Sequence, residues 1–152
     1  MALPNIFDPA VATGIIERIN KLTPATQPKW GKMNVGQMLA HCCVTYEMIY
    51  DNKHAAPKGV LKWMLKTFVK GAVVTEKPYK HNSRTGPAFL MTTEKEFNTE
   101  KERLINYIKK TQQLGGSHFD QKESLSFGKL SGTEWNNMFY KHLDHHLSQF
   151  GV

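Results

Sequence analysis

The last thirteen residues contain three of the seven histidines of this 152-residue chain. His142 and His146 are four positions apart, and Gln149 follows three positions later. On an α-helix these positions share a face, so both imidazoles and the amide are expected to project in the same direction. Two imidazoles one turn apart suit a borderline metal ion such as zinc, nickel or iron. The spacing therefore predicts part of a metal site on a terminal helix.

A second pairing of imidazoles is available in the same stretch. His142 and His145 also lie within one turn, but that pair leaves His146 off the common axis. His142 with His146 is the preferred pair, because Gln149 extends their line and is a candidate to orient a ligand or to contact substrate.

A third ligand is expected from another helix. His41 lies in an apolar segment, Met38-Leu-Ala-His-Cys-Cys-Val44, where an unpartnered imidazole would be costly to bury. His54, His81 and His118 lie in polar contexts and are interpreted as surface residues, although the long loop that carries His118 could bring it to the site from above. His41 is therefore the best candidate for the third ligand.

Two other chemistries are disfavoured. Leu143 occupies the position of the glutamate base in a zinc-protease helix, and the chain contains no Gly-x-Ser-x-Gly elbow and no phosphate-binding glycine loop. Cys42 and Cys43 point away from the direction of His41 on an ideal helix, so we expect them to pack in the core. A nucleophilic role for either thiol stays open, but a buried thiol is poorly activated.

The elements that must position these residues are helices. Caps and apolar periodicity predict helices from Asp8 to about residue 22, from Asn34 to about 51, from about 57 to 70, from Thr93 to about 114, and from Ser131 to about 149. Gln37 completes a capping box with Asn34, and a contact with substrate or with a metal ligand is an equal alternative for it. Thr93 with Glu96, and Ser131 with Glu134, are predicted to form the capping boxes of the last two helices. A long loop over 117–130 is interpreted as a functional or lid-like segment.

The helix over 57–70 is basic. Seven lysines and one glutamate lie between positions 53 and 80, within a chain whose formal net charge is +7. Four of the lysines recur every fourth residue, opposite an apolar side, and they are Lys58, Lys62, Lys66 and Lys70. A solvated lysine face is the favoured interpretation, and a docking surface for an anionic substrate, phospholipid or nucleic acid is the alternative. No nucleic-acid-binding motif accompanies the lysines, so nucleic acid is not the expected partner.

Size and composition place these helices in one domain. Residues 1–152 are long enough for a hydrophobic core, and no run of eighteen apolar residues could span a membrane. The N-terminus lacks the pattern of a secretory signal, and the two adjacent cysteines are typical of a reducing cytoplasm. We therefore expect a cytoplasmic all-α bundle of four principal helices and one accessory helix, with the site at its open end.

The pattern is similar to that of a known group of proteins. Trp30 with Met33-Asn-Val-Gly-Gln-Met-Leu-Ala-His41, together with the terminal His142-x-x-His-His146-x-x-Gln149, resembles the DinB/YfiT-like superfamily of metalloenzymes, in a branch described as a domain of unknown function. The resemblance implies an up-down-down-up four-helix bundle, often a homodimer, in which three histidines bind a divalent metal. It places these ligands at His41, His142 and His146.

The resemblance also suggests a reaction. Relatives include thiol-dependent S-transferases and a mycothiol-dependent maleylpyruvate isomerase, in which the metal lowers the pKa of a cofactor thiol. The hypothesis is a metal-dependent enzyme acting on a small-molecule substrate with a low-molecular-weight thiol. The alternatives are a metal-dependent hydrolase and a non-catalytic bundle that binds a ligand or partner. Three imidazoles do not distinguish zinc, nickel, iron and manganese.

Overall fold

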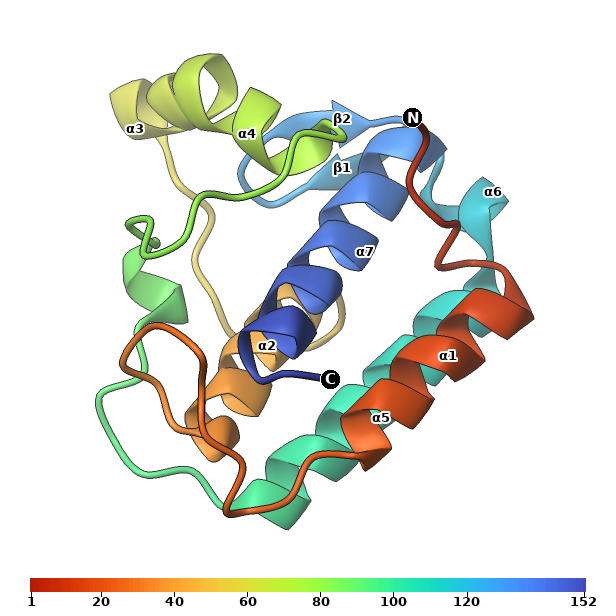
Figure 1. Cartoon of the computed structure of the whole chain (residues 1–152). Coiled ribbons are helices and arrows are strands. Elements are labelled where there is room, and N and C mark those ends of the chain that lie inside the picture. Colours follow the sequence, from red (N-terminus) through yellow and green to blue (C-terminus); the bar gives the residue numbers. More distant parts are fainter.

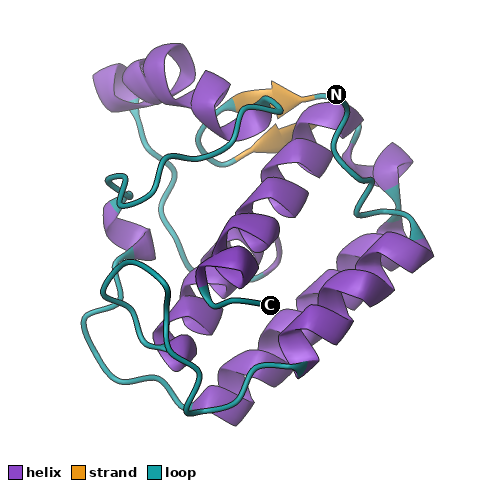
Figure 2. Ribbon diagram, in the orientation of Figure 1, coloured by secondary structure: helices purple, strands orange, loops and turns teal.

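The computed structural model describes residues 1–152 and is mostly helical, with one two-stranded sheet (Figure 1). The four longest helices are α1 (Pro9–Asn20), α2 (Val35–Tyr50), α5 (Phe97–Leu114) and α7 (Gly132–Gln149). Helix α5 packs against α1 and α2, and α7 packs against the same two helices. The prediction of a helical fold is confirmed, while the sheet, coloured orange in Figure 2, departs from the all-α class.

Three of the predicted helix starts are capped as the sequence indicates. Asp8 accepts a hydrogen bond from the amide of Ala10 at 2.8 Å and begins α1. Reciprocal capping boxes begin α2, between Asn34 and Gln37, and α7, between Ser131 and Glu134. These side chains satisfy amides that have no partner within the helix. The starts of α1, α2 and α7 therefore follow from local chemistry.

The start of α5 differs from the prediction. The sequence places Glu96 at the third helical position behind a Thr93 cap, but in the structure Glu96 is itself the N-cap and accepts from the amides of Asn98 and Thr99. Its carboxylate lies at the positive end of the helix dipole. It therefore stabilises the helix start in the same way as the shorter side chains that usually cap helices. The capping box between Thr93 and Glu96 is therefore wrong, and α5 begins at Phe97.

The core lies between the four long helices. Its largest members from α7 recur at every fourth position, and the buried side chains include Ile15 and Ile19 from α1, Leu39, Cys42 and Tyr46 from α2, Leu104 and Ile108 from α5, and Trp135, Phe139, Leu143 and Leu147 from α7. Leu143 thus has a packing role, and both cysteines are buried as predicted. On α7 the buried apolar side chains face the core. This orientation turns the adjacent side of the helix, which carries His142 and His146, toward α2.

The segment predicted as one basic helix over 57–70 is interrupted. It consists of α3 (Gly59–Met64), a π-helical turn (Leu65–Val69) and α4 (Lys70–Val74). Its main contact with the long helices is that of α4 with α7, and it lies beside the sheet at one end of the molecule (Figure 1). The solvated lysine face is present only in part: Lys58 and Lys66 are exposed, whereas Lys62 and Lys70 are half-buried and pair with Glu123 and Glu134. Most apolar side chains of this segment are exposed as well, which the prediction did not include.

The loop predicted over 117–130 is ordered structure. It contains α6 (Gly116–Phe119) and an antiparallel hairpin of β1 (Lys122–Ser124) and β2 (Gly128–Leu130). Phe119 and Leu130 are fully buried in the core. The lid-like interpretation is therefore wrong, because this segment closes one end of the core.

The stretch between α4 and α5 is irregular and contains a short 3-10 turn at Pro87–Phe89 that packs against α2. No helix in the structure has the length and apolar character needed to cross a bilayer.

Candidate metal centre

Three imidazoles meet between α2 and α7. The Nε2 atoms of His41 and His142 are 3.0 Å apart. His146 completes the group, and one ring nitrogen from each of the three residues lies within 4.8 Å of the others. The structure thus brings together the three histidines that the sequence selects from two helices separated by about a hundred residues.

The outer nitrogen of each ring has a partner of its own. Nδ1 of His41 donates to the carbonyl of Phe89 at 2.8 Å, which leaves its Nε2 without a proton. Nδ1 of His142 lies 3.3 Å from the hydroxyl of Thr45. The 3-10 turn and α2 therefore orient two of the rings.

Gln149 orients the third ring. Its Nε2 donates to the carbonyl of Trp30 at 2.8 Å, so its Oε1 faces Nδ1 of His146 at 2.7 Å. Because the amide oxygen can only accept, Nδ1 of His146 carries the proton and Nε2 keeps its lone pair. Outer partners of this kind are typical of histidines that bind metals.

The environment keeps these rings neutral. His41 and His146 are buried, and His142 is partly exposed. Burial lowers the pKa of His41, and it lowers the pKa of His146 to about 3, with the His41 ring adding to the effect. Desolvation and then the neighbouring His146 and His41 hold the pKa of His142 well below its usual value. Neutral imidazoles are the form that binds a metal ion.

The donor set fits a first-row divalent ion. Two nitrogens bound to one zinc ion at about 2.0–2.1 Å lie roughly 3.0–3.4 Å apart, depending on the bond angle. The 3.0 Å separation of the His41 and His142 Nε2 atoms lies at this spacing. Three imidazoles leave coordination positions for other molecules, which is the arrangement of catalytic rather than structural sites. The cluster could therefore hold a metal ion and a reactant together.

The two glutamines proposed for the site have different surroundings. Gln149 contacts His146 directly. Gln37 accepts from the amide of Asn34 and donates to the carbonyl of Thr93, so both ends of its amide are used at the start of α2. The structure therefore places Gln37 in the capping role.

Four further side chains line one side of the cluster. His81 stacks on Trp30 with a centroid distance of 3.7 Å, and His145 lies edge-on to Trp30 at 5.8 Å and to Tyr79 at 5.6 Å. His81 is exposed, as the sequence predicts, yet it lies at the rim of the site. Its approach depends on the irregular 76–91 stretch, whose path no periodicity reveals.

The other polar candidates lie elsewhere. His118 is exposed on α6 beside Phe119, so it does not reach the cluster. His54 pairs with Glu47 at 2.8 Å. Burial raises the pKa of the Cys43 thiol to about 12 and that of Cys42 well above its usual value, so neither thiol is activated.

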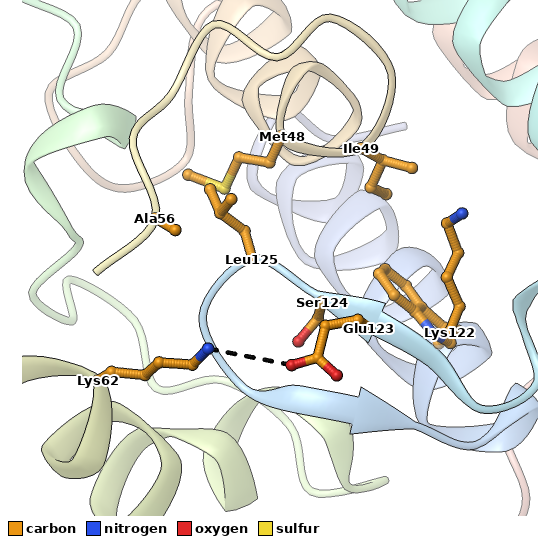
Figure 3. Close-up of a pocket in the computed structure, with 9 residues that line it drawn as sticks. Met48, Ile49, Ala56, Lys62, Lys122, Glu123, Ser124 and Leu125 are labelled. Atoms are coloured by element: carbon orange, nitrogen blue, oxygen red, sulfur yellow. Dashed lines mark ion pairs between the residues drawn. The ribbon is translucent and has the colours of Figure 1, made fainter. Parts of the chain in front are cut away.

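A separate pocket of about 340 Å³ lies between the end of α2, α3 and the hairpin (Figure 3). Lys62 and Glu123 both line it and form an ion pair of 3.9 Å, and Met48, Ile49 and Leu125 give it an apolar side. No histidine lines it, so it is not part of the metal centre.

Comparison with known proteins gives one match. A family model described as "Protein of unknown function (DUF1569)" matches residues 11–151, a range that includes all three clustered histidines. No curated protein and no solved structure is significantly similar to the chain.

Proposed function

The chain belongs to the DUF1569 family of proteins of unknown function, and we propose that it is a metal-dependent enzyme in which His41, His142 and His146 bind one divalent ion. The observation that carries this proposal is the common polarity of the three rings. Each Nδ1 faces an outer oxygen, and each Nε2 is left for the common centre. The Nε2 atoms of His41 and His142 already lie 3.0 Å apart, a separation at which one metal ion can bind both.

The bound ion would supply Lewis acidity. A divalent metal with open positions lowers the pKa of a water or thiol bound to it, which makes hydroxide or thiolate available near neutral pH. The protein's own part is to hold the three rings in one orientation and to keep them unprotonated. The rings are oriented by their contacts with Gln149, Thr45 and the Phe89 carbonyl. They stay neutral because burial lowers their pKa values.

We favour thiol transfer or a thiol-dependent isomerisation as the reaction. The support is the resemblance of the His41 segment and the terminal histidines to the DinB/YfiT-like superfamily. On the same ground we propose that α1, α2, α5 and α7 form an up-down-down-up bundle in a single domain, residues 1–152, and that the protein is a homodimer. The packing of α5 and α7 against both other long helices is consistent with this topology.

The rim residues have roles in this proposal. Trp30 and Tyr79 offer flat apolar surfaces beside the cluster and limit access of water to it. Desolvation by burial lowers the pKa of His145, so at neutral pH its ring is available to accept a proton from a small-molecule substrate or thiol. His81 lies against both the Trp30 and His145 rings and holds them in place.

Metal analysis tests the proposal. Protein purified without a histidine tag is offered zinc, nickel, iron and manganese in turn, and one equivalent of at least one ion should be retained. His146→Ala should lose this ion with its helical content unchanged, while His118→Ala, which removes an exposed histidine, should keep it. Failure of all four ions to bind, or unchanged binding in His146→Ala, contradicts the assignment.

A turnover assay tests the reaction. The metal-loaded protein is mixed with glutathione, cysteine or mycothiol and an aryl halide electrophile, and thioether formation is compared with that of His146→Ala. Metal binding without thiol transfer in any combination would favour the hydrolase or the non-catalytic alternative.

A further inference from the structure

The outer side of α3 and the following π-helical turn is apolar and exposed. Six of the nine large hydrophobic side chains exposed on the whole chain lie between positions 60 and 69, and they are Val60, Leu61, Trp63, Met64, Phe68 and Val69. Trp63 is 60% exposed and Phe68 is 69% exposed, and their rings meet edge to face at 5.9 Å. Such a cluster on one surface marks an interaction site.

Three of the four lysines of this segment reach back toward the protein. Lys62 pairs with Glu123 of β1, and Lys70 pairs with Glu134 of α7 at 3.1 Å. The ammonium group of Lys66 lies beside Gly128 of β2. An amphipathic helix on a globular protein normally turns its apolar face inward and its charges outward. Here the order is reversed, so the apolar face is directed at something other than this chain's core.

The reversed orientation is held in place from within. Val74 at the end of α4 is buried against the core. Lys141 of α7 donates from Nζ to the carbonyls of Ala72, Thr75 and Lys77 at 2.6–3.0 Å. These contacts fix the C-terminal end of the segment, so rotation of α4 to bury the apolar side would break them.

We propose that residues 59–74 dock on the surface of an anionic lipid bilayer. Trp63 and Phe68 enter the boundary between headgroups and acyl chains, and the segment lies in the plane of the surface rather than across it. Lys58 and Lys66 are exposed, and Lys62 and Lys70 keep 37% and 27% of their side chains exposed, so positive charge lies beside the apolar side where anionic headgroups can approach it. Trp and Lys in this arrangement are typical of membrane-surface helices.

Charge favours lipid over a second copy of the chain as the occupant. The sequence from position 53 to 80, which carries the apolar cluster, contains seven lysines and one glutamate, and the whole chain carries a formal charge of +7. Two copies meeting through this surface would bring their lysines together, and like charges at an interface oppose association. Phosphatidylserine headgroups would instead neutralise them.

Flotation with vesicles tests the docking. The protein should float with phosphatidylcholine vesicles that contain about 30 mol% phosphatidylserine at low salt, and much less with pure phosphatidylcholine. Binding should fall as NaCl is raised to about 0.5 M, because salt screens the lysines. The double variant Trp63→Ser/Phe68→Ser should lose binding. The matched control Leu90→Ser/Leu114→Ser, which removes two exposed apolar side chains elsewhere, should keep it.

Two further variants separate insertion from general attraction. Trp63→Phe should still bind but should lose the fluorescence quenching that brominated acyl chains cause in the wild type. Lys58→Gln, at an exposed lysine, should weaken binding about fivefold.

Binding that persists in the double variant overturns the proposal. The proposal is also overturned if the wild-type protein does not bind vesicles but forms a concentration-dependent dimer that the double variant abolishes. The apolar surface would then be covered by a second copy of the chain. Circular dichroism of each variant shows whether the helices are intact.

Discussion

Gln149 connects His146 to the loop that carries Trp30. Its amide oxygen accepts from Nδ1 of His146 at 2.7 Å, and its amide nitrogen donates to the Trp30 carbonyl at 2.8 Å. The side chain is 4% exposed, so water does not compete for either bond. One residue thus fixes the tautomer of a candidate ligand and ties the site to a segment more than a hundred positions away.

Gln149→Leu should lower metal affinity by about 10- to 100-fold while the fold persists. The leucine fills a similar volume but cannot accept the proton on Nδ1, so the His146 ring loses its preferred orientation. A competition titration with a chromophoric chelator measures the change. Gln112→Leu is the matched control, because Gln112 hydrogen bonds to the Phe7 carbonyl and lies outside the cluster. Equal affinities in the two variants would mean that Gln149 has no part in metal binding.

Gly31→Ala should weaken metal binding through the same glutamine. A Cβ at Gly31 would lie 2.5 Å from Nε2 of Gln149, so the amide must move and its bond to Trp30 is lost. The backbone φ of +85° adds strain of about 1–2 kcal/mol. Gly59→Ala is the control, since its φ of +56° brings similar strain with open space around the new methyl group.

Chelator titration and thermal unfolding separate the two effects. Both glycine variants should lose stability, and only Gly31→Ala should lose metal affinity. A similar loss of affinity in Gly59→Ala would show that backbone strain, and not Gln149, accounts for the change.

The candidate site could be predicted from the sequence because its signal is local. The spacing of His142 and His146 on a helix, and the placement of His41 within an apolar helical segment, both follow from periodicity. The helix starts of α1, α2 and α7 follow from caps in the same way. The hydrogen-bond partner of His41 Nδ1 could not be predicted from the sequence, because the Phe89 carbonyl is supplied by an irregular segment.

The surface segment and the hairpin could not be predicted for a different reason. The alternation of Lys62, Lys66 and Lys70 with apolar residues fixes two faces but not which of them meets the protein. Glu123 and Glu134, from β1 and α7, attract the lysine face inward. The strands that carry Glu123 and Gly128 are three residues long, too short for an alternating pattern to be visible.

Acid should destabilise the metal-free protein. The folded pKa values of His41, His142 and His146 are lowered, whereas an unfolded histidine titrates near ~6.5. Between those values the unfolded chain binds more protons, so stability is complete above pH ~6.5 and is lost as the pH falls toward the folded values. Each ring that stays neutral contributes up to about 1.4 kcal/mol of loss per pH unit.

Urea unfolding in the presence of a chelator, at a series of pH values from neutral to mildly acidic, measures this slope. His146→Leu should reduce the slope by about one proton, and His118→Ala should leave it unchanged. A wild-type protein whose free energy of unfolding is constant over this range would show that the rings are charged in the folded state.

Lys141→Met should loosen the segment that we propose to dock on lipid. The ammonium group is the shared donor to the carbonyls of Ala72, Thr75 and Lys77, and its side chain is 5% exposed. Methionine keeps the apolar stem but leaves those carbonyls without this donor, at a cost of about 1–3 kcal/mol. Hydrogen exchange should accelerate over residues 70–77 before it changes in α2 or α5.

The exposed Lys109→Met on α5 is the matched control and should change neither exchange nor stability. If Lys141→Met instead raised exchange uniformly along the chain, the lysine would contribute to global packing and would not act as a local anchor. A local effect has a further consequence: an unanchored segment can turn its apolar side inward, so Lys141→Met should also reduce flotation with anionic vesicles. This coupling would connect a buried lysine on the histidine-bearing helix to the exposed surface at the far end of the molecule.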